Sequence, residues 1–226
     1  MSDKAKRNAA TAAVALVEDG MRLGIGTGST AEQFIRLLAE RTGAGLSVIG
    51  VPTSERTADL CRDLGIPLTD LEATPSLDLA VDGADEFDPG LHLIKGGGGA
   101  LLREKIVAAA AERFVVIADA SKRVPMLGAF ALPVEIIPMA CRPLSRRIAD
   151  LGAEVVLRQG ADGEAFRSDE GHWILDCAFG PTITDPPALA TTLSALAGVV
   201  DHGLFCGMTE RVLVGADDGV EEVVAG

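Results

Sequence analysis

The sequence predicts an α/β protein in which an open, mostly parallel sheet domain of the Rossmann-like type is joined to a smaller α+β domain of the ferredoxin-like type. Short apolar strands alternate with helices from the start of the chain to Lys122, which is the pattern of a parallel sheet with helices on both faces. Beyond Arg123, prolines interrupt the chain and the expected order becomes βαββαβ. Polar, glycine-rich segments follow several early strands, at the edge where such sheets bind ligands.

Helices in the first part are predicted from apolar residues at helical spacing, such as Ala9, Ala13 and Leu16, and strands from short apolar runs between turn residues. Ser29 or Thr30 is a natural N-cap for the helix that follows the first glycine turn. We expect helices at residues 3–18, from about 29 onward, at 54–64 and at 100–112. We expect strands at 21–26, 46–51, 67–71, 77–81 and 114–118.

The second part is predicted from the same signals, with Asp162-Gly163 and Asp169-Glu170-Gly171 as turns between strands. We expect strands at residues 134–137, 153–157, 172–178 and 199–205, and helices at 144–151 and 187–196. Residues 211–214 and 218–224 are expected to form a last strand and tail.

Composition restricts the class of protein. The 226 residues are 48% hydrophobic and 23% charged, which is ordinary for a soluble globular protein of one large or two small domains. A net charge of −13 and only 4% aromatic residues argue against a nucleic-acid surface. No apolar run is long enough for a membrane span, and the first residues do not resemble a secretory signal. A cytoplasmic protein that binds neither nucleic acid nor membrane is therefore expected.

The segment Gly26-Thr27-Gly28-Ser29-Thr30 joins a strand to a helix, which makes it a candidate anion site. Backbone N–H groups and the positive end of the helix dipole point toward a ligand there, and the hydroxyl groups add donors. A Walker P-loop is excluded because GK[ST] is missing. The loose dinucleotide pattern that ends at Ala31 lacks an acidic residue at the end of the next strand, so NAD binding is disfavoured.

The segment 81–105, VDGADEFDPGLHLIKGGGGALLREK, is the most unusual in the chain. A run of four glycines lets backbone N–H groups approach an oxyanion closely, Lys95 supplies a cation, and Glu104 supplies a possible base. Asp82 and Asp85 stand where the preceding strand ends. The alternative is a glycine-rich surface loop before a solvated helix, but buried apolar runs on both sides favour a functional site.

An anion site, carboxylates and cations together suit proton abstraction next to a carbonyl group. No GxSxG motif or Cys–His arrangement for a nucleophile is present, and the three histidines match no zinc spacing. The four cysteines are scattered and are expected to be small buried side chains in a reducing compartment.

Six motifs in this order resemble the type A ribose-5-phosphate isomerase family: GTGSTA, DGADE, KGGGGALLREK, ADASK, LPVEIIP and GLF. The resemblance covers nearly the whole chain. It implies interconversion of ribose 5-phosphate and ribulose 5-phosphate through an enediolate in the non-oxidative pentose phosphate pathway, without metal or cofactor. It also implies a homodimer or a dimer of dimers. The expected sheet domain is residues 1–127 with 207–226, and the small domain is residues 128–206.

The resemblance also implies roles for residues. Glu104 would be the base, Lys95 with Gly96, Gly97 and Gly98 would surround the enediolate, and Asp82 and Asp85 would bind sugar hydroxyls and assist ring opening. The remaining substrate-binding residues implied are Thr27, Gly28, Ser29, Thr30, Gly83, Ala84, Lys122 and Lys6. The hairpin SDEGH at 168–172 departs from the family's frequent TDNGN, which bears on surface or oligomer contacts.

Two other functions fit related folds. A sugar-phosphate sensor would need a DNA-binding module, which has no spare segment here, and would not need Glu104. A coenzyme A transferase would use a glutamate as nucleophile, but it normally needs a larger chain or a partner subunit, and an acyl-transfer assay separates it from the isomerase.

Overall fold

The structure is a computed structural model that describes residues 2–225. The chain forms two compact units. The first, the sheet unit, contains the residues through Ala84, Arg103–Arg123, and those from Met208 onward. The second, the antiparallel unit, contains Asp85–Leu102 and Val124–Gly207.

The sheet unit is built on a six-stranded sheet with the order β13-β12-β6-β3-β1-β2. Its first five strands in sequence run parallel, and β13 pairs antiparallel with β12 at one edge. Every residue of β6 is buried, as expected for a strand covered on both faces. The strands are β1 Arg22–Ile25, β2 Ile49–Pro52, β3 Leu79–Asp82, β6 Phe114–Asp119, β12 Arg211–Ala216 and β13 Gly219–Val224.

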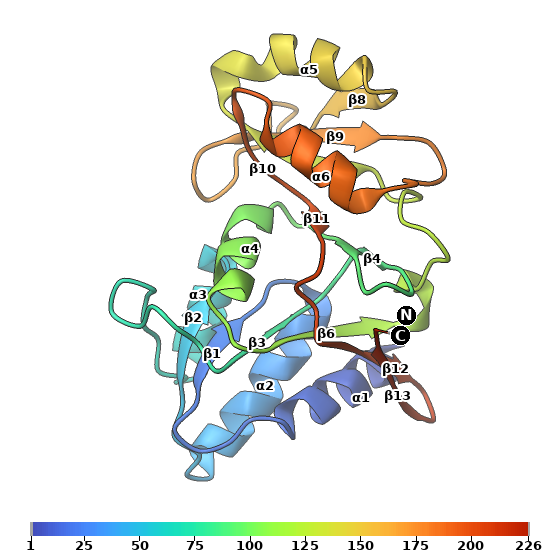
Figure 1. Ribbon diagram of the computed structural model, residues 1–226. Coiled ribbons are helices and arrows are strands. Elements are labelled where there is room, and N and C mark those ends of the chain that lie inside the picture. The colour runs from blue at the N-terminus through green and yellow to red at the C-terminus, as the bar shows by residue number, and fades with distance from the viewer. Residues whose placement is uncertain (1, 226) are drawn as a thin grey trace. The chain divides into compact units, whose positions relative to one another are not determined.

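Helices cover both faces of this sheet. The pair α1 (Asp3–Val14) and α2 (Ser29–Gly43) lies side by side on one face (Figure 1), where Leu23, Leu79 and Val115 join the core. The helix α4 (Leu101–Ala109) packs on the other face, with Val107 against Gly24 of β1. The helix α3 (Glu55–Asp63) follows β2, and the 3₁₀ helix η1 (Ala120–Lys122) follows β6. The predicted parallel sheet with helices on both faces is confirmed.

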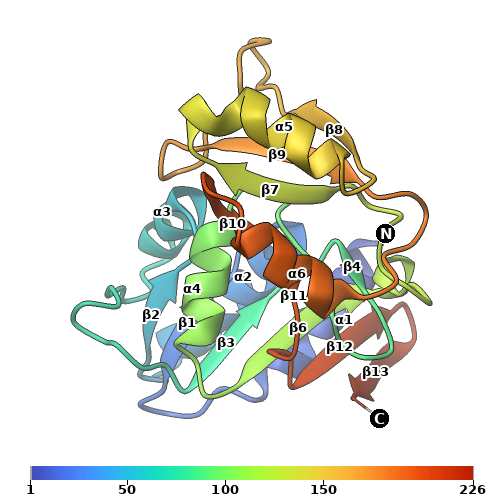
Figure 2. The same ribbon diagram turned by 45° about the horizontal axis from the view of Figure 1, so that its top comes forward.

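The antiparallel unit has the element order βαββαβ that the sequence predicts. Its four-stranded sheet has the order β10-β7-β9-β8 and can be followed in Figure 2. Side chains of both of its α-helices join one core with β7 and β9. The elements are β7 Leu132–Ile136, η2 Pro138–Ala140, α5 Cys141–Ala149, β8 Glu154–Leu157, β9 Trp173–Ala178, α6 Pro186–Ser194 and β10 Val199–His202.

A second, three-stranded sheet in the antiparallel unit was not predicted. It consists of β4 (Glu86–Phe87), β5 (Leu93–Ile94) and β11 (Leu204–Phe205), in the order β11-β5-β4. Because β5 pairs with β11, residues 85–102 belong to this unit by contact, whereas the expected boundaries put them with the parallel sheet. Two-residue strands give too short a pattern to be seen in a sequence.

Four expectations about elements are wrong. The expected tail 218–224 contains the strand β13, which pairs with β12. Residues 67–71 form only one bridge, between Leu68 and Gly50, because the chain turns away at Asp70. The expected strand 199–205 divides at Gly203, which donates to Pro133 O and accepts from Lys95 N, so that its two halves join different sheets. The first helix ends at Val14 rather than at 18.

Replacing Gly215 by alanine tests the close packing of α1 on β12. A Cβ atom at Gly215 would overlap the carbonyl group of Ala5, 2.9 Å from its carbon atom. Because the obstacle is helix backbone and cannot rotate away, we expect Gly215→Ala to lower the free energy of unfolding by about 1–3 kcal/mol in urea denaturation. The control is Gly43→Ala at the end of α2, where space is open, which should be neutral or stabilise by up to about 1 kcal/mol. Equal stability of the two variants would contradict this packing.

The pair Arg22–Asp78 predicts a pH-dependent contribution to stability. Hydrogen bonds from the Arg22 side chain, and then from its backbone N–H at 2.7 Å, lower the pKa of Asp78. A carboxylate with a depressed folded-state pKa stabilises above its unfolded pKa of about 3.9, and this contribution disappears as the pH falls through the lower folded-state value. Thermal unfolding should therefore show Asp78→Asn below wild type at neutral pH, with the difference shrinking in acid.

The control for this prediction is Asp59→Asn. The pair Asp59–Arg62 on α3 is exposed, so its removal should change the melting temperature little at any pH. A difference between Asp78→Asn and wild type that stays constant down to roughly pH 3 would contradict the assignment.

Candidate active site

The order of the strands reverses in the sheet between β1 and β3. From β1 the chain passes to β2 on one side and afterwards to β3 on the other, so that the segments after β1 and β3 follow the carboxyl ends of adjacent parallel strands. Open α/β sheets bind ligands at such a switch point. The loop after β1 is the predicted anion segment that begins at Gly26, and β3 ends in the buried residue Asp82. The structure thus places two predicted groups at one edge of the sheet.

Asp82 is held by the backbone of both loops. One carboxylate oxygen, Oδ1, accepts from the N–H of Thr27 at 3.0 Å and from the N–H of Gly83 at 2.7 Å. A Cβ atom at Gly26 would lie 2.6 Å from the Asp82 Cα, so only glycine fits at that position. The close approach of the two loops explains why the first glycine of the motif is needed.

The Thr27 hydroxyl is the centre of a cluster that the sequence analysis missed. It lies 2.7 Å from the hydroxyl oxygen of Thr53, 2.8 Å from that of Ser54 and 3.1 Å from that of Thr57. The Thr57 hydroxyl also donates to the carbonyl oxygen of Gly26 at 3.0 Å. These bonds fix the loop after β1 from the end of β2. The run Pro52-Thr53-Ser54 could have indicated this cluster, because it places two hydroxyl groups at the end of a strand beside the switch point.

The helix α2 begins without a side-chain cap. Gly28 is its N-cap, with φ at +113°, so the expectation of Ser29 or Thr30 at that position is wrong. Glycine takes this place because the turn needs a positive φ, which shifts Ser29 into the first helical turn. The Lys6 ammonium group donates to the Ser29 hydroxyl at 2.8 Å. An uncapped helix N-terminus with an adjacent lysine has the chemistry of an anion site.

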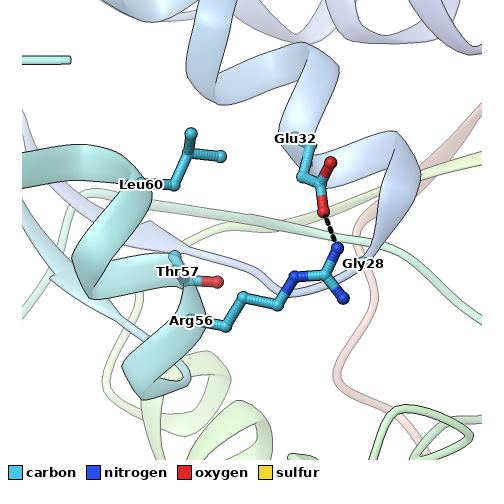
Figure 3. Close-up of a pocket in the computed structure, with 5 residues that line it drawn as sticks. All are labelled: Gly28, Glu32, Arg56, Thr57 and Leu60. Atoms are coloured by element: carbon cyan, nitrogen blue, oxygen red, sulfur yellow. Dashed lines mark hydrogen bonds and ion pairs between the residues drawn. The ribbon is translucent and has the colours of Figure 1, made fainter. Parts of the chain in front are cut away.

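A pocket opens beside Gly28 (Figure 3). It has a volume of about 210 Å³ and lies between the N-terminal parts of α2 and α3. Arg56 and Glu32 form an ion pair across it, and the hydroxyl group of Thr57 faces it. Leu60 completes the lining.

The remaining predicted residues of the sheet unit lie after β6 and in α4. Glu104 is in the first turn of α4 and is 6% exposed. The preceding Arg103 donates to Glu55 of α3 at 2.8 Å, and this bond is the main cause that lowers the pKa of Glu55. Lys122 is the last residue of η1, which is capped by the Asp119 carboxylate. Ala84 is the last residue of the N-terminal segment of the sheet unit.

In the antiparallel unit, Lys95 directly follows β5. Its backbone N–H donates to the carbonyl oxygen of Gly203 at 2.9 Å, and its ammonium group lies 5.5 Å from the centroid of the Phe205 ring. The residue is only 2% exposed. A lysine enclosed in this way is held in one place, and the aromatic face stabilises its positive charge. Phe205 was missed as a site residue because it is distant in sequence.

The glycine loop 96–99 follows Lys95. The N–H of Gly97 donates to Oδ2 of Asp85 at 2.7 Å, and the N–H of Asp85 donates to the carbonyl oxygen of Ile94 at 2.8 Å. Gly96 and Gly99 have φ values of +104° and +83°, which explains two of the four glycines. Gly97 and Gly98 are exposed. The loop therefore has a fixed beginning and end and an accessible middle.

The predicted site residues are thus divided between the units. Thr27, Asp82 and Gly83 are hydrogen-bonded together in the sheet unit, which also holds Glu104. Asp85 and Gly97 are bonded together in the antiparallel unit, which also holds Lys95. In residues 2–225, no group of three or more His, Cys, Asp or Glu side chains is arranged to hold a metal ion. No helix in the same range has the length and apolar character to cross a membrane.

Comparison with known proteins gives a consistent result. The family model described as ribose 5-phosphate isomerase A (phosphoriboisomerase A) matches residues 49–219. A ribose-5-phosphate isomerase A from Parvibaculum lavamentivorans is 53% identical, with 99% of each chain covered. That from Agrobacterium fabrum is 55% identical, with 97% of each chain covered.

Solved structures agree with the sequence relatives. The ribose 5-phosphate isomerase A from Methanocaldococcus jannaschii is 41% identical, with a TM-score of 0.95 over 99% of this chain and 100% of that one. A D-ribose-5-phosphate isomerase in complex with phospho-erythronic acid is 38% identical, with a TM-score of 0.96 over the same shares. The motifs, the fold and these matches lead to one conclusion: the chain belongs to the ribose 5-phosphate isomerase A family.

Proposed function

We propose that this protein interconverts D-ribose 5-phosphate and D-ribulose 5-phosphate in the pentose phosphate pathway. The observation that carries the proposal is the match to ribose-5-phosphate isomerases over 99% of the chain. One of the matching structures contains phospho-erythronic acid. The carboxylate of this phosphorylated sugar acid has the planar shape and negative charge of an enediolate, which supports a reaction through that intermediate.

The reaction moves one proton between neighbouring carbons. In the open-chain aldose, a base removes the proton on C2, a C1–C2 double bond forms, and the C1 carbonyl oxygen takes up the electron pair. Return of the proton to C1, together with transfer of the O2 proton to O1, gives the ketose, with a carbonyl group at C2 and a hydroxyl group at C1. We assign the base to Glu104, because it is a buried carboxylate in the first turn of α4. The reaction as proposed needs no metal and no cofactor.

Lys95 and the glycine loop stabilise the negative oxygen atoms of the enediolate. The support for this role is that Lys95 is buried and held against Phe205, so that its charge is already oriented before the substrate binds. The exposed Gly97 and Gly98 carry no side chains, so their backbone can approach an oxyanion closely.

The other residues bind the sugar phosphate. Asp82 and Asp85, with Gly83 and Ala84, accept hydrogen bonds from sugar hydroxyls and assist ring opening. The segment Thr27 to Thr30 and the N-terminus of α2 bind the phosphate, and Lys6 and Lys122 supply positive charge. This role is supported by the contact of Lys6 with Ser29 and by the absence of a side-chain cap on α2.

We propose further that the enzyme acts in the cytoplasm as a homodimer or a dimer of dimers. The proposal rests on the family resemblance. It agrees with the exposure of Met139 and Val156 in the antiparallel unit, at 90% and 56%, because burial of apolar side chains in an interface is favourable. A monomer in sedimentation velocity at assay concentration would contradict this assembly.

Glu104→Gln tests the assignment of the base. The amide keeps the shape of the side chain but cannot take a proton, so kcat should fall by about 10²–10⁴ while the sugar phosphate still binds. Conversion of ribose 5-phosphate should be measured after EDTA treatment, with incorporation of deuterium from the solvent as a second readout. Glu112→Gln, at an exposed glutamate beyond α4, is the control and should have wild-type turnover. Turnover of Glu104→Gln close to wild type would remove Glu104 as the base.

Lys95→Met tests the role of the buried cation. Methionine fills a similar volume, so the fold should persist, while the loss of charge removes an interaction that strengthens as the enediolate forms. We expect kcat to fall by about 10²–10³ and KM to change much less. Lys4→Met on the exposed side of α1 is the matched control. A change confined to KM would restrict Lys95 to substrate binding.

A further inference from the structure

One peptide group in the glycine loop is held at both ends by charged side chains. The carbonyl oxygen of Gly96 accepts from Nη1 of Arg158 at 2.8 Å. The N–H of Gly97, which belongs to the same peptide group, donates to Oδ2 of Asp85 at 2.7 Å. Because no cis peptide bond occurs in residues 2–225, this oxygen and hydrogen point in opposite directions. A guanidinium group therefore holds one side of the peptide plane and a carboxylate holds the other.

Arg158 is itself well supported. It directly follows β8, and its Nε donates to Oδ2 of Asp176 on β9 at 3.0 Å, while a second nitrogen binds the other carboxylate oxygen. The Arg158 side chain is 14% exposed, so solvent screens this two-point pair only weakly. Because both oxygen atoms of the Asp176 carboxylate accept hydrogen bonds from Arg158, the orientation of the guanidinium plane is fixed. The third nitrogen of the fixed guanidinium group, Nη1, is therefore directed at the loop, where it contacts the carbonyl oxygen of Gly96 at 2.8 Å and that of Gly97 at 3.4 Å.

The far end of the loop contacts an aromatic ring. A Cβ atom at Gly99 would overlap the ring of Phe166, so the backbone is in close contact with that ring. The centre of the Arg158 guanidinium group lies 5.8 Å from the centroid of the same ring. Arg158 therefore contacts the beginning of the loop and Phe166 contacts its end. The two side chains also contact each other.

The charges alternate along this chain of contacts. Asp176 is negative, Arg158 is positive, the peptide carbonyl oxygen is partially negative and its N–H partially positive, and Asp85 is negative. A cation on the carbonyl oxygen polarises the peptide and strengthens the donation by its N–H. Four consecutive glycines lose much conformational entropy on ordering, so the loop needs such contacts to keep one conformation.

We propose that Arg158 is a positioning residue that fixes the Gly96–Gly97 peptide and, through it, the carboxylate of Asp85. Asp176 and Phe166 act with it by orienting the guanidinium group. This inference rests on the proposed function, in which Asp85 and the loop engage the sugar. Its consequence is that residues of the βαββαβ part of the chain govern the order of the glycine loop without touching the reacting atoms.

The kinetic test compares Arg158→Met, Arg158→Lys and the control Arg167→Met. Arg167 is exposed in the same unit, and its guanidinium contacts the carbonyl oxygen of Gly171 instead. We expect Arg158→Met to lower kcat by at least about tenfold with KM within about threefold of wild type, because a small displacement of a positioned group costs turnover. Arg158→Lys keeps the positive charge and a donor group but not the planar two-point pair with Asp176, and it should therefore retain more activity than Arg158→Met. The proposal is overturned if Arg158→Met and Arg167→Met have the same kcat.

A second measurement tests, without an activity assay, whether Arg158 holds the Gly96–Gly97 peptide in place; we call this contact the Arg158 clamp. Amide hydrogen exchange at Gly97, followed by NMR in the intact protein, should be at least about tenfold faster in Arg158→Met than in Arg167→Met, since the bond to Asp85 opens more often. If Arg158→Met does not fold, the same comparison is made with Arg158→Lys, for which a smaller acceleration is expected. The same exchange rate at Gly97 in the Arg158 variant and in Arg167→Met would overturn the proposal that Arg158 holds this peptide. Faster exchange in a protein whose wild type does not convert ribose 5-phosphate would support the clamp and refute the proposed function.

Discussion

The two backbone hydrogen bonds to Oδ1 of Asp82 are the constraint on which the candidate site depends. They join the loop after β1 to the end of β3 at the point where the order of the strands reverses. A buried carboxylate oxygen that accepts two amide N–H groups has little freedom to move. The hydroxyl cluster around Thr27 fixes the same loop from the side of β2. The beginning of α2, with Ser29 and its neighbour Lys6, is therefore set by contacts that reach across three adjacent strands.

Much of the fold could be predicted from local patterns. The apolar run 114–118 became the fully buried strand β6, and the spacing of Ala9 and Ala13 marked the buried face of α1. The run 67–71 did not form a strand, because pairing depends on a neighbouring edge that local sequence does not encode. The short strand β5 pairs in the same way with the distant strand β11 on one side and with β4 on the other, and no pattern in a two-residue segment reveals this.

The candidate site could be predicted where one segment contains the candidate residues, and it could not be predicted where distant residues support them. Asp82, Asp85, Lys95 and Glu104 all lie within the conspicuous segment 81–105. Phe205 under Lys95 and Arg158 on the Gly96 carbonyl come from elements more than 60 residues further along the chain. In the sequence both look like ordinary core or surface residues, and only their contacts in the folded protein connect them to the candidate site. Candidate catalytic residues stand out in the composition of a segment, whereas the distant side chains that contact them do not.

The order of strands in the sheet unit has a consequence for how the chain folds during synthesis. The strand β12 lies between β6 and β13, and α1 packs against it so closely that Gly215 has no room for a side chain. The helix α1 packs on α2 and β6 as well, but its docking surface is complete only when the much later strand β12 has been synthesised. Until then, one side of β6 has no neighbouring strand and the apolar face of α1 lacks part of its cover. Such long-range pairing slows folding and exposes a sheet edge to aggregation, so the nascent chain is vulnerable until its C-terminal hairpin is complete.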